Sequence, residues 1–353
     1  MVKKILRLLW RAALGLFGLG LILILAVVLI NCFDEDLNPV PAALQPPPNR
    51  LKPDQNLYMA IAGIDAPEGV SQLGFAEKKL AQYKRDVETL DRSAPEVSIN
   101  VPDVPHIGQV EFRGHLDFVK PLISSVWLAM PNHRADIQKL LTDNQVLYQH
   151  YLALHEFQGY YDTSPPTPQP PYFFYVRQEL RNLFLADIAL RMRSTDMEER
   201  KNALAQLEAD IRTWHVMLTG EGTLLSQMLA VAYLNADYLL LADMIADEKV
   251  DVESFSAEFE RMVAPFDYAD WKTGKSMVHE FQLQQPVWRA LAVSRAYKAG
   301  RDPIDESWWS RTEQRFEWHF LKKNATSNLN TQYFLQAITV ANSDPETFSR
   351  AFF

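Results

Sequence analysis

The pattern of hydrophobic and polar residues changes along this chain, and near its start it is an uninterrupted apolar run. From Ala12 to Ile30, nineteen residues carry no charge and are dominated by Leu, Ile, Val, Gly and Ala. At about 1.5 Å per residue, a helix of that length spans roughly 28 Å, close to the hydrocarbon thickness of a bilayer. The sequence therefore predicts a transmembrane helix over residues 12–33.

Prolines dominate the next stretch. Six of them fall between Asn38 and Pro53, including three in a row at 46–48. Proline lacks the amide hydrogen and clashes with the preceding helical turn, so this stretch cannot form a helix. We expect residues 34–53 to be a semi-rigid spacer that holds a domain off the bilayer.

The rest of the chain, residues 54–353, shows mostly helical periodicity. Ala76, Leu80, Tyr83 and Val87 recur at three- and four-residue intervals and predict one apolar helix face. Further helices are expected at 132–157, 172–192, 195–218, 223–247, 252–263, 277–299 with a break near Pro286, and 306–323. The predicted fold class is mainly α: a helical bundle or α-solenoid-like domain follows the transmembrane helix, with little or no β-structure.

Two of these helices carry more specific signals. Thr195-Asp196-Met197-Glu198 has the form of a capping box, which marks a helix start. The helix at 223–247 is apolar on nearly every face, yet Gln227 and Asp237 are among the polar residues that interrupt it. Buried polar residues are costly in lipid, so the sequence favours a central helix of the domain over a second membrane span.

Two stretches lack helical periodicity. Val97, Ile99 and Val101 alternate with polar residues, which predicts extended chain or a short strand. Residues 164–171 include five prolines and could divide the domain in two or form a surface loop within it. We expect a surface loop within one domain, because the helices predicted before and after residues 164–171 are of similar character.

The distribution of charge orients the chain in the membrane. Four of the 35 basic residues precede the apolar run, whereas all 44 acidic residues follow it. The positive-inside rule then makes residues 1–11 a cytoplasmic tail and places residues 54–353 outside the cytoplasm. Beyond the anchor, 31 basic residues face 44 acidic ones, a balance of −13 that argues against nucleic-acid binding.

Cys32 is the one cysteine, which excludes internal disulfides and thiolate zinc sites. It also raises two alternatives to an uncleaved anchor. A cleaved secretory signal needs a small-x-small site, which Asn31-Cys32-Phe33 does not offer. A lipoprotein signal would acylate Cys32, but Asn31 is not the small residue usual before such a cysteine. All three possibilities place the domain on the same side of the membrane.

The sequence contains no complete catalytic or metal-binding motif. His155-Glu156 and His279-Glu280 each resemble half of a zinc-protease motif, but Gly159 and Leu283 occupy the positions of the second histidine. The two pairs could still converge on one site, or they could be polar residues at helix edges. We therefore predict no cofactor and no metal, and the sequence leans against an enzyme.

Two other clusters favour packing over chemistry. Asp210 and His215 lie five residues apart, which does not place them on one helix face, and Trp214 between them suggests a packing seam. A second cluster is aromatic and could stack on sugars or lipid tails, although core packing is the favoured interpretation: Trp308, Trp309, Phe316, Trp318 and Phe320.

Residues 56–69 contain an Asn-x-Tyr sequence followed by Gly-x-Asp-Ala-Pro-x-Gly. This segment resembles the start of the exported domain in a group of uncharacterised proteobacterial membrane-anchored periplasmic proteins, and residues 210–214 and 224–232 are similar to that group as well. The resemblance implies a Gram-negative inner-membrane protein whose main domain faces the periplasm. It implies no activity.

The residues of that segment allow two interpretations. Asp65-Ala66-Pro67 can form a turn in which the carboxylate accepts backbone N–H bonds, which would be a structural role. Alternatively, Asn56, Tyr58 and Asp65 could form a surface recognition patch.

The leading functional hypothesis is a non-enzymatic periplasmic module that binds or scaffolds an envelope protein or component. One alternative is a cell-envelope enzyme whose site brings together His155, Glu156, His279 and Glu280. The other is a helical cavity that carries an apolar ligand.

Overall fold

The computed structural model describes residues 2–32, 35–93, 109–116, 126–129, 133–166, 176–271, 273–285 and 323–343. Within these ranges the protein is mainly helical and has no strand, which confirms the predicted fold class. The expected strand at Val97–Val101, the aromatic cluster at 308–320 and residues 167–171 of the second proline run lie outside the described residues.

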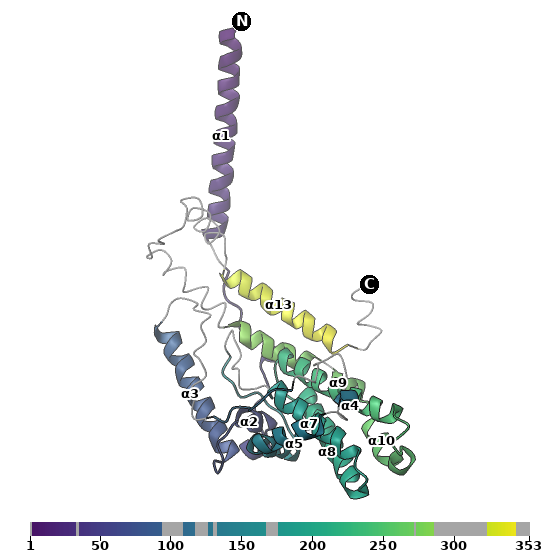
Figure 1. Ribbon diagram of the computed structural model, residues 1–353. Coiled ribbons are helices and arrows are strands. Elements are labelled where there is room, and N and C mark those ends of the chain that lie inside the picture. The colour runs from purple at the N-terminus through teal and green to yellow at the C-terminus, as the bar shows by residue number, and fades with distance from the viewer. Residues whose placement is uncertain are drawn as a thin grey trace.

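Helix α1 (Val2–Cys32) extends away from the other helices (Figure 1). Its described apolar side chains are exposed, among them Leu16 and Phe17 at 72% each. Among the described helices, α9 (Leu224–Ala246) is long and apolar enough to cross a membrane by length and composition. The described apolar part of α1, Leu14–Val27, is shorter.

Helices α2 (Leu57–Ala62) and α3 (Gln72–Ser93) pack against each other at the start of the body. Every residue of α2 is buried. Gly63 ends this helix, and a Cβ atom there would lie 2.0 Å from the carbonyl oxygen of Gln72. Glycine at position 63 is therefore what allows the first turn of α3 to pass so close. The predicted apolar face of α3 is confirmed, since Ala76 and Tyr83 are fully buried.

The helix predicted over 132–157 is interrupted. Short α4 (Val126–Ala129) precedes α5 (Arg134–Asp143), and Asn144 separates α5 from α6 (Gln145–Ala153). The buried Asn144 side chain accepts a hydrogen bond from Arg113 N at 2.7 Å and donates to Arg113 O at 2.9 Å. This pairing ties the chain at residue 113 to the α5–α6 junction, which hydrophobic periodicity does not reveal. A 3-10 turn, η4 (Leu154–Glu156), follows.

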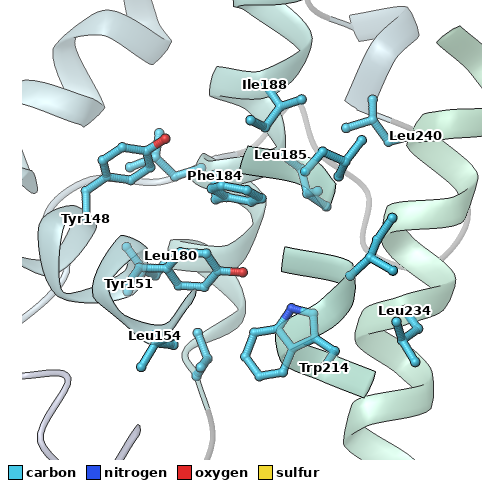
Figure 2. Packing of buried hydrophobic residues seen from close by; sticks show 14 of the residues in the cluster. Tyr148, Tyr151, Leu154, Leu180, Phe184, Leu185, Ile188, Trp214, Leu234 and Leu240 are labelled. Carbon is cyan, nitrogen blue, oxygen red and sulfur yellow. The ribbon is translucent and has the colours of Figure 1, made fainter. Parts of the chain in front are cut away.

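Helices α7 (Gln178–Met192), α8 (Met197–Thr219) and α9 form the centre of the body. Figure 2 shows their apolar side chains meeting those of α6, with the ring of Tyr151 5.0 Å from that of Phe184. Asp196, not Thr195, caps α8 by accepting from Glu198 N at 2.9 Å, so the predicted helix start is one residue early. Thr223 caps α9, as expected from a helix at 223–247.

Helix α9 is packed inside the body along α8 and α7. Its polar residues Ser226, Gln227 and Asp237 are buried, whereas Met228 is 61% exposed. A helix that buries an aspartate against neighbouring helices fits the prediction of a central helix, although its length and composition also satisfy a membrane span.

The remaining elements surround this centre. They are η6 (Glu253–Phe255), α10 (Ser256–Met262), η7 (Tyr268–Trp271), a helix over residues 274–285, and α13 (Lys323–Ala341). The sequence did not predict α13, because its Asn, Ser and Thr residues lower helix propensity and its apolar residues are not confined to one face.

Residues 35–53, here called the strap, lie along the body (Figure 1) instead of forming a free spacer. The strap contains two 3-10 turns, η1 (Ala42–Leu44) and the start of η2 (Pro53–Gln55). Leu44 is fully buried in a small cluster with Phe281 and Phe334. Gln282 Nε2 donates to Leu44 O at 2.8 Å. The expected spacer is therefore part of the fold, because one leucine among the prolines packs into the body.

We expect Leu44→Ala to detach the strap. Leucine-to-alanine substitutions at fully buried sites cost about 2–5 kcal/mol, and this small cluster has few other apolar contacts to hold it. Limited proteolysis should then cut the strap faster than in the parent protein. Val40→Ala, in the same segment at a 38% exposed side chain, is the control and should leave the cleavage rate unchanged. Equal rates for Leu44→Ala and Val40→Ala would contradict this role.

Candidate functional site

A cleft of about 560 Å³ opens between the strap and the body. The strap contributes Pro47, Pro48, Arg50 and Leu51 to its lining. The body contributes residues 158–161, just after η4, and residues 216 and 219–221 at the end of α8. Two segments far apart in sequence therefore define one concave surface, which is the usual form of a binding site.

The strap is held in place at the cleft by two specific contacts. Tyr161 Oη donates to Pro47 O at 2.7 Å. Leu51 packs against Gly159, where a Cβ atom would come within 2.8 Å of both leucine methyl groups. Glycine at position 159 therefore permits the strap to approach the body closely.

Asn56 holds the body side of the cleft. Its side chain accepts from Tyr161 N at 2.9 Å and from Tyr58 N at 3.2 Å, and donates to Tyr161 O at 2.9 Å. Leu57 N also donates to Gly159 O at 2.8 Å. One buried amide thus fixes both the start of α2 and the loop that lines the cleft.

The same loop pairs with the turn after α8. Glu221 N donates to Tyr160 O at 2.9 Å, and Asp162 N donates to Glu221 O at 2.8 Å. These bonds place the side chain of Glu221 at the cleft, next to the ring of Tyr161.

Glu221 is the charged residue on the body side of the cleft. Its Oε1 lies 3.3 Å from Lys275 Nζ and its Oε2 lies 3.8 Å from His279 Nε2. The His279 imidazole and the Lys275 ammonium lower the pKa of Glu221, although partial burial opposes this. Glu221 is therefore ionised at neutral pH, and the exposed Arg50 lines the same cleft from the strap side.

Asp162 follows Tyr161 of the cleft lining and is buried, with 6% of its surface exposed. Its Oδ1 accepts from Ser164 N at 2.8 Å and from Ser164 Oγ at 2.6 Å, while none of the described residues donates to Oδ2. Burial raises the pKa of Asp162. The Ser164 bonds turn the chain at this point and keep the carboxyl away from solvent.

The structure buries two of the three predicted recognition residues and leaves the third, Asp65, partly exposed. Asn56 is 1% exposed and Tyr58 is fully buried. Asp65 accepts two hydrogen bonds from Lys79 Nζ, at 2.8 and 3.0 Å, and its backbone carbonyl accepts from Val110 N. These residues therefore join elements of the fold, and their side chains do not form a surface patch.

The two His-Glu pairs do not share a site within the described residues. His155 contacts Asp210, whereas His279 lies beside Tyr161 and Glu221. Glu280 accepts from Leu224 N at 2.9 Å and so caps α9. No group of three or more potential metal-ligating residues comes together in the part of the chain that the structure describes.

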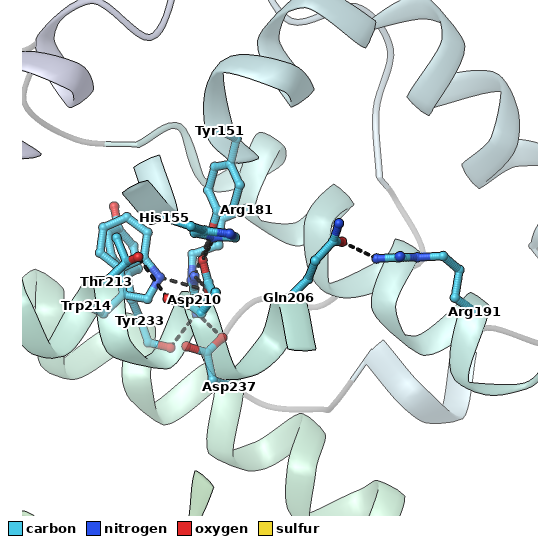
Figure 3. A network of polar contacts seen from close by, with 11 residues as sticks. Tyr151, His155, Arg181, Arg191, Gln206, Asp210, Thr213, Trp214, Tyr233 and Asp237 are labelled. Atoms are coloured by element: carbon cyan, nitrogen blue, oxygen red, sulfur yellow. Dashed lines mark hydrogen bonds and ion pairs between the residues drawn. The ribbon is translucent and has the colours of Figure 1, made fainter. Parts of the chain in front are cut away.

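A buried network of polar side chains joins η4 to the three central helices (Figure 3). At its centre, Asp210 of α8 accepts four contacts. Its Oδ1 accepts a hydrogen bond from Tyr151 Oη at 2.8 Å and lies 3.0 Å from His155 Nε2. Its Oδ2 accepts hydrogen bonds from Arg181 Nη1 at 2.7 Å and from Trp214 Nε1 at 2.9 Å. Because His155 belongs to η4, Asp210 fixes the start of the loop that lines the cleft.

Arg181 of α7 connects Asp210 to α9. Its Nη2 donates to Asp237 and to Tyr233 O, and its guanidinium carbon lies 4.8 Å from the ring centre of Tyr233. Arg181, Asp210 and Asp237 are all almost fully buried. One guanidinium thus faces two carboxyl groups away from water, and it links the three central helices.

The two carboxyl groups are not equivalent. Although burial opposes ionisation, Arg181 and His155 together hold the pKa of Asp210 below its usual range. Burial, reinforced by the charge on Asp210 and only partly offset by Arg181, raises the pKa of Asp237. A single arginine can compensate for the charge of one carboxylate, and the opposite pKa shifts favour that charge on Asp210 over Asp237.

The comparisons with known proteins do not extend this picture. The sequence matches no protein-family model, no curated protein and no solved structure. The resemblance of residues 56–69 to an exported proteobacterial group stays a prediction.

Proposed function

We propose that the protein is anchored in a membrane by α1 and binds a partner through the cleft between the strap and the body. The anchor is supported by nineteen consecutive uncharged residues whose described apolar side chains are exposed along α1. Among the described helices, α9 is the one long and apolar enough to cross a membrane, but its Asp237 is buried against Arg181 of α7. A helix whose buried aspartate is bound by an arginine of a neighbouring helix belongs to the body.

The four basic residues at the start of α1, before its apolar run, favour a cytoplasmic N-terminus, with the body on the opposite face of the membrane. Together with the resemblance of residues 56–69, this supports an inner-membrane protein whose body lies in the periplasm. The partner would then be another envelope protein.

The lining of the cleft is the observation that carries the binding proposal. Arg50 and Glu221 offer opposite charges on its two sides, and Tyr161 already donates its hydroxyl to a proline carbonyl. Tyrosine and proline surfaces of this kind recognise extended peptide segments, whose carbonyl groups accept hydrogen bonds at regular intervals. The cleft therefore suits an extended polar segment of a partner protein carrying both signs of charge.

Photo-crosslinking in intact cells tests this proposal. A photoreactive amino acid replaces Gln158, an exposed residue in the lining, and the crosslinked partner is identified by mass spectrometry. Arg50→Glu reverses one of the two charges, and we expect it to reduce the crosslinked product by about tenfold, as for a loss of about 1.4 kcal/mol. Lys52→Glu is a matched control, because Lys52 is exposed in the same segment but does not line the cleft.

A partner whose capture falls with Arg50→Glu and not with Lys52→Glu supports the proposal. Capture that responds equally to both substitutions reflects general charge and overturns it. So does the absence of any crosslinked protein at position 158 across several growth conditions.

A further inference from the structure

Helix α13 presents an apolar stripe on the side that faces away from the body. Phe334 and Asn328 are buried on the inner side, whereas Leu329 is 67% exposed and Tyr333 is 65% exposed. Two smaller apolar residues one and two turns further on are partly exposed. Intervals of four, four and three residues place the four members in one row along the helix: Leu329, Tyr333, Ala337 and Val340.

The surroundings of this stripe carry little charge. Lys323 is the single charged residue among the nineteen of α13, in a chain whose region beyond the anchor has a balance of −13. Neutral amides, Gln332 and Gln336, lie exposed beside the stripe. An uncharged helix face with apolar residues and a tyrosine is typical of a membrane interface.

The strap fixes α13 near the end of α1. Asn324 Nδ2 donates to Glu35 O at 2.7 Å, and Asn328 Nδ2 donates to Asp36 O at 2.9 Å. Asn38 N donates back to Asn328 Oδ1 at 3.0 Å. Glu35 is three residues beyond the last residue of α1, a reach of about 10 Å at most. The polar zone of a bilayer is several ångströms thick on each side, so the first turns of α13 are held at that depth.

We propose that the Leu329–Val340 stripe of α13 lies in the lipid interface and forms a second contact between this protein and the membrane. The inference rests on the proposed anchor, because it is α1 that brings α13 to the bilayer. The two large exposed side chains, Leu329 and Tyr333, lie in the first eleven of the nineteen residues of α13 and carry most of the contact. The stripe contacts the region between the lipid headgroups and the acyl chains, because it is apolar and does not need anionic lipid. Two contacts would fix the direction in which the cleft faces, which a single helix cannot do.

Quenching of fluorescent labels by lipid tests this contact in the full chain. Cys32→Ser removes the native cysteine and gives a background for single labels at Leu329→Cys and Tyr333→Cys. Leu21→Cys reports on the anchor, and Glu260→Cys in α10, which is exposed on the body, is the control away from the membrane. Each variant is reconstituted into phosphatidylcholine vesicles with and without nitroxide-labelled phosphatidylcholine.

We expect the nitroxide lipid to quench most of the fluorescence at positions 21, 329 and 333 and little at 260, with no change when salt is raised. Quenching at 21 without quenching at 329 and 333 overturns this inference while the anchor stands. No quenching at 21 overturns the anchor and the inference together. Crosslinking of two chains through position 333, again without lipid quenching, would make the stripe an interface between copies and equally overturn it.

Discussion

Replacing Arg181 by methionine should destabilise the body by about 3–5 kcal/mol, the cost of removing one partner from a buried ion pair. Methionine fills a similar volume, so the effect comes from charge and hydrogen bonding. Asp210 would lose its strongest counter-charge among the described residues, and Asp237 would lose the donor to its Oδ1. The measurement is urea unfolding of the detergent-solubilised protein, followed by far-ultraviolet circular dichroism.

Arg177→Met provides the control for this experiment. Arg177 is one turn earlier, at the start of the same helix, and is exposed. A substitution there should change the free energy of unfolding by less than about 0.5 kcal/mol. If Arg181→Met and Arg177→Met had the same small effect, the buried network would not contribute to the stability of the body.

The central helices could be predicted from the sequence because their residues favour a helix over long stretches and a capping motif marks the start of α8. Thr223 caps α9 at the expected position. The network inside them could not be predicted in the same way. Arg181 is one of several charged residues in α7, and nothing local marks it as the residue that turns inward to Asp210. Asp237 in an apolar helix was the one available signal, since a buried acid requires a partner.

The candidate site was missed for a related reason. Residues 34–53 were interpreted from their prolines, which correctly exclude a long helix but do not show where the segment lies. Its position depends on Leu44, which is buried by Phe281 and Phe334 from the distant C-terminal part of the chain. Contacts of this kind join residues more than two hundred positions apart, and periodicity within a window does not detect them. The cleft follows from that contact, because the strap contributes a third of its lining residues, four of twelve.

Asn56 and Tyr58 show the opposite case, in which residues that stand out in the sequence are buried and have a structural role. The asparagine binds the backbone of Tyr161, more than one hundred residues away. A distinctive segment can therefore reflect a demanding packing position as easily as a surface that binds a partner.

Asp210→Asn and Asp237→Asn should have very different effects, although the two substitutions are chemically identical and both sites are buried. At pH 7 we expect Asp210→Asn to cost at least about 2 kcal/mol, because a charged acceptor with four contacts becomes neutral. Asp237→Asn should cost less than about 1 kcal/mol. The amide is neutral like the protonated acid that it replaces, and its oxygen still accepts from Arg181.

The dependence on pH separates the two roles. The folded-state pKa of Asp210 lies below its unfolded value, so its contribution to stability is present above the unfolded pKa and is lost as the pH falls. The folded-state pKa of Asp237 is raised, so stability is full below the unfolded pKa and is lost as the pH rises towards the folded value. Between about pH 7 and pH 4, the deficit of Asp210→Asn should therefore shrink only near the acidic end. Asp237→Asn should instead become less stable relative to the parent as the pH falls.

Unfolding free energies of the parent and both variants, measured at several pH values in one buffer series, decide between these expectations. Opposite slopes for the two variants would show that one buried carboxyl carries the charge and the other carries a proton. Equal costs with parallel slopes would mean that Arg181 shares its charge evenly between Asp210 and Asp237. In that case the contacts of Tyr151 and His155 with Asp210, and with them the loop after η4, would depend less on the ionised state of Asp210 than the geometry indicates.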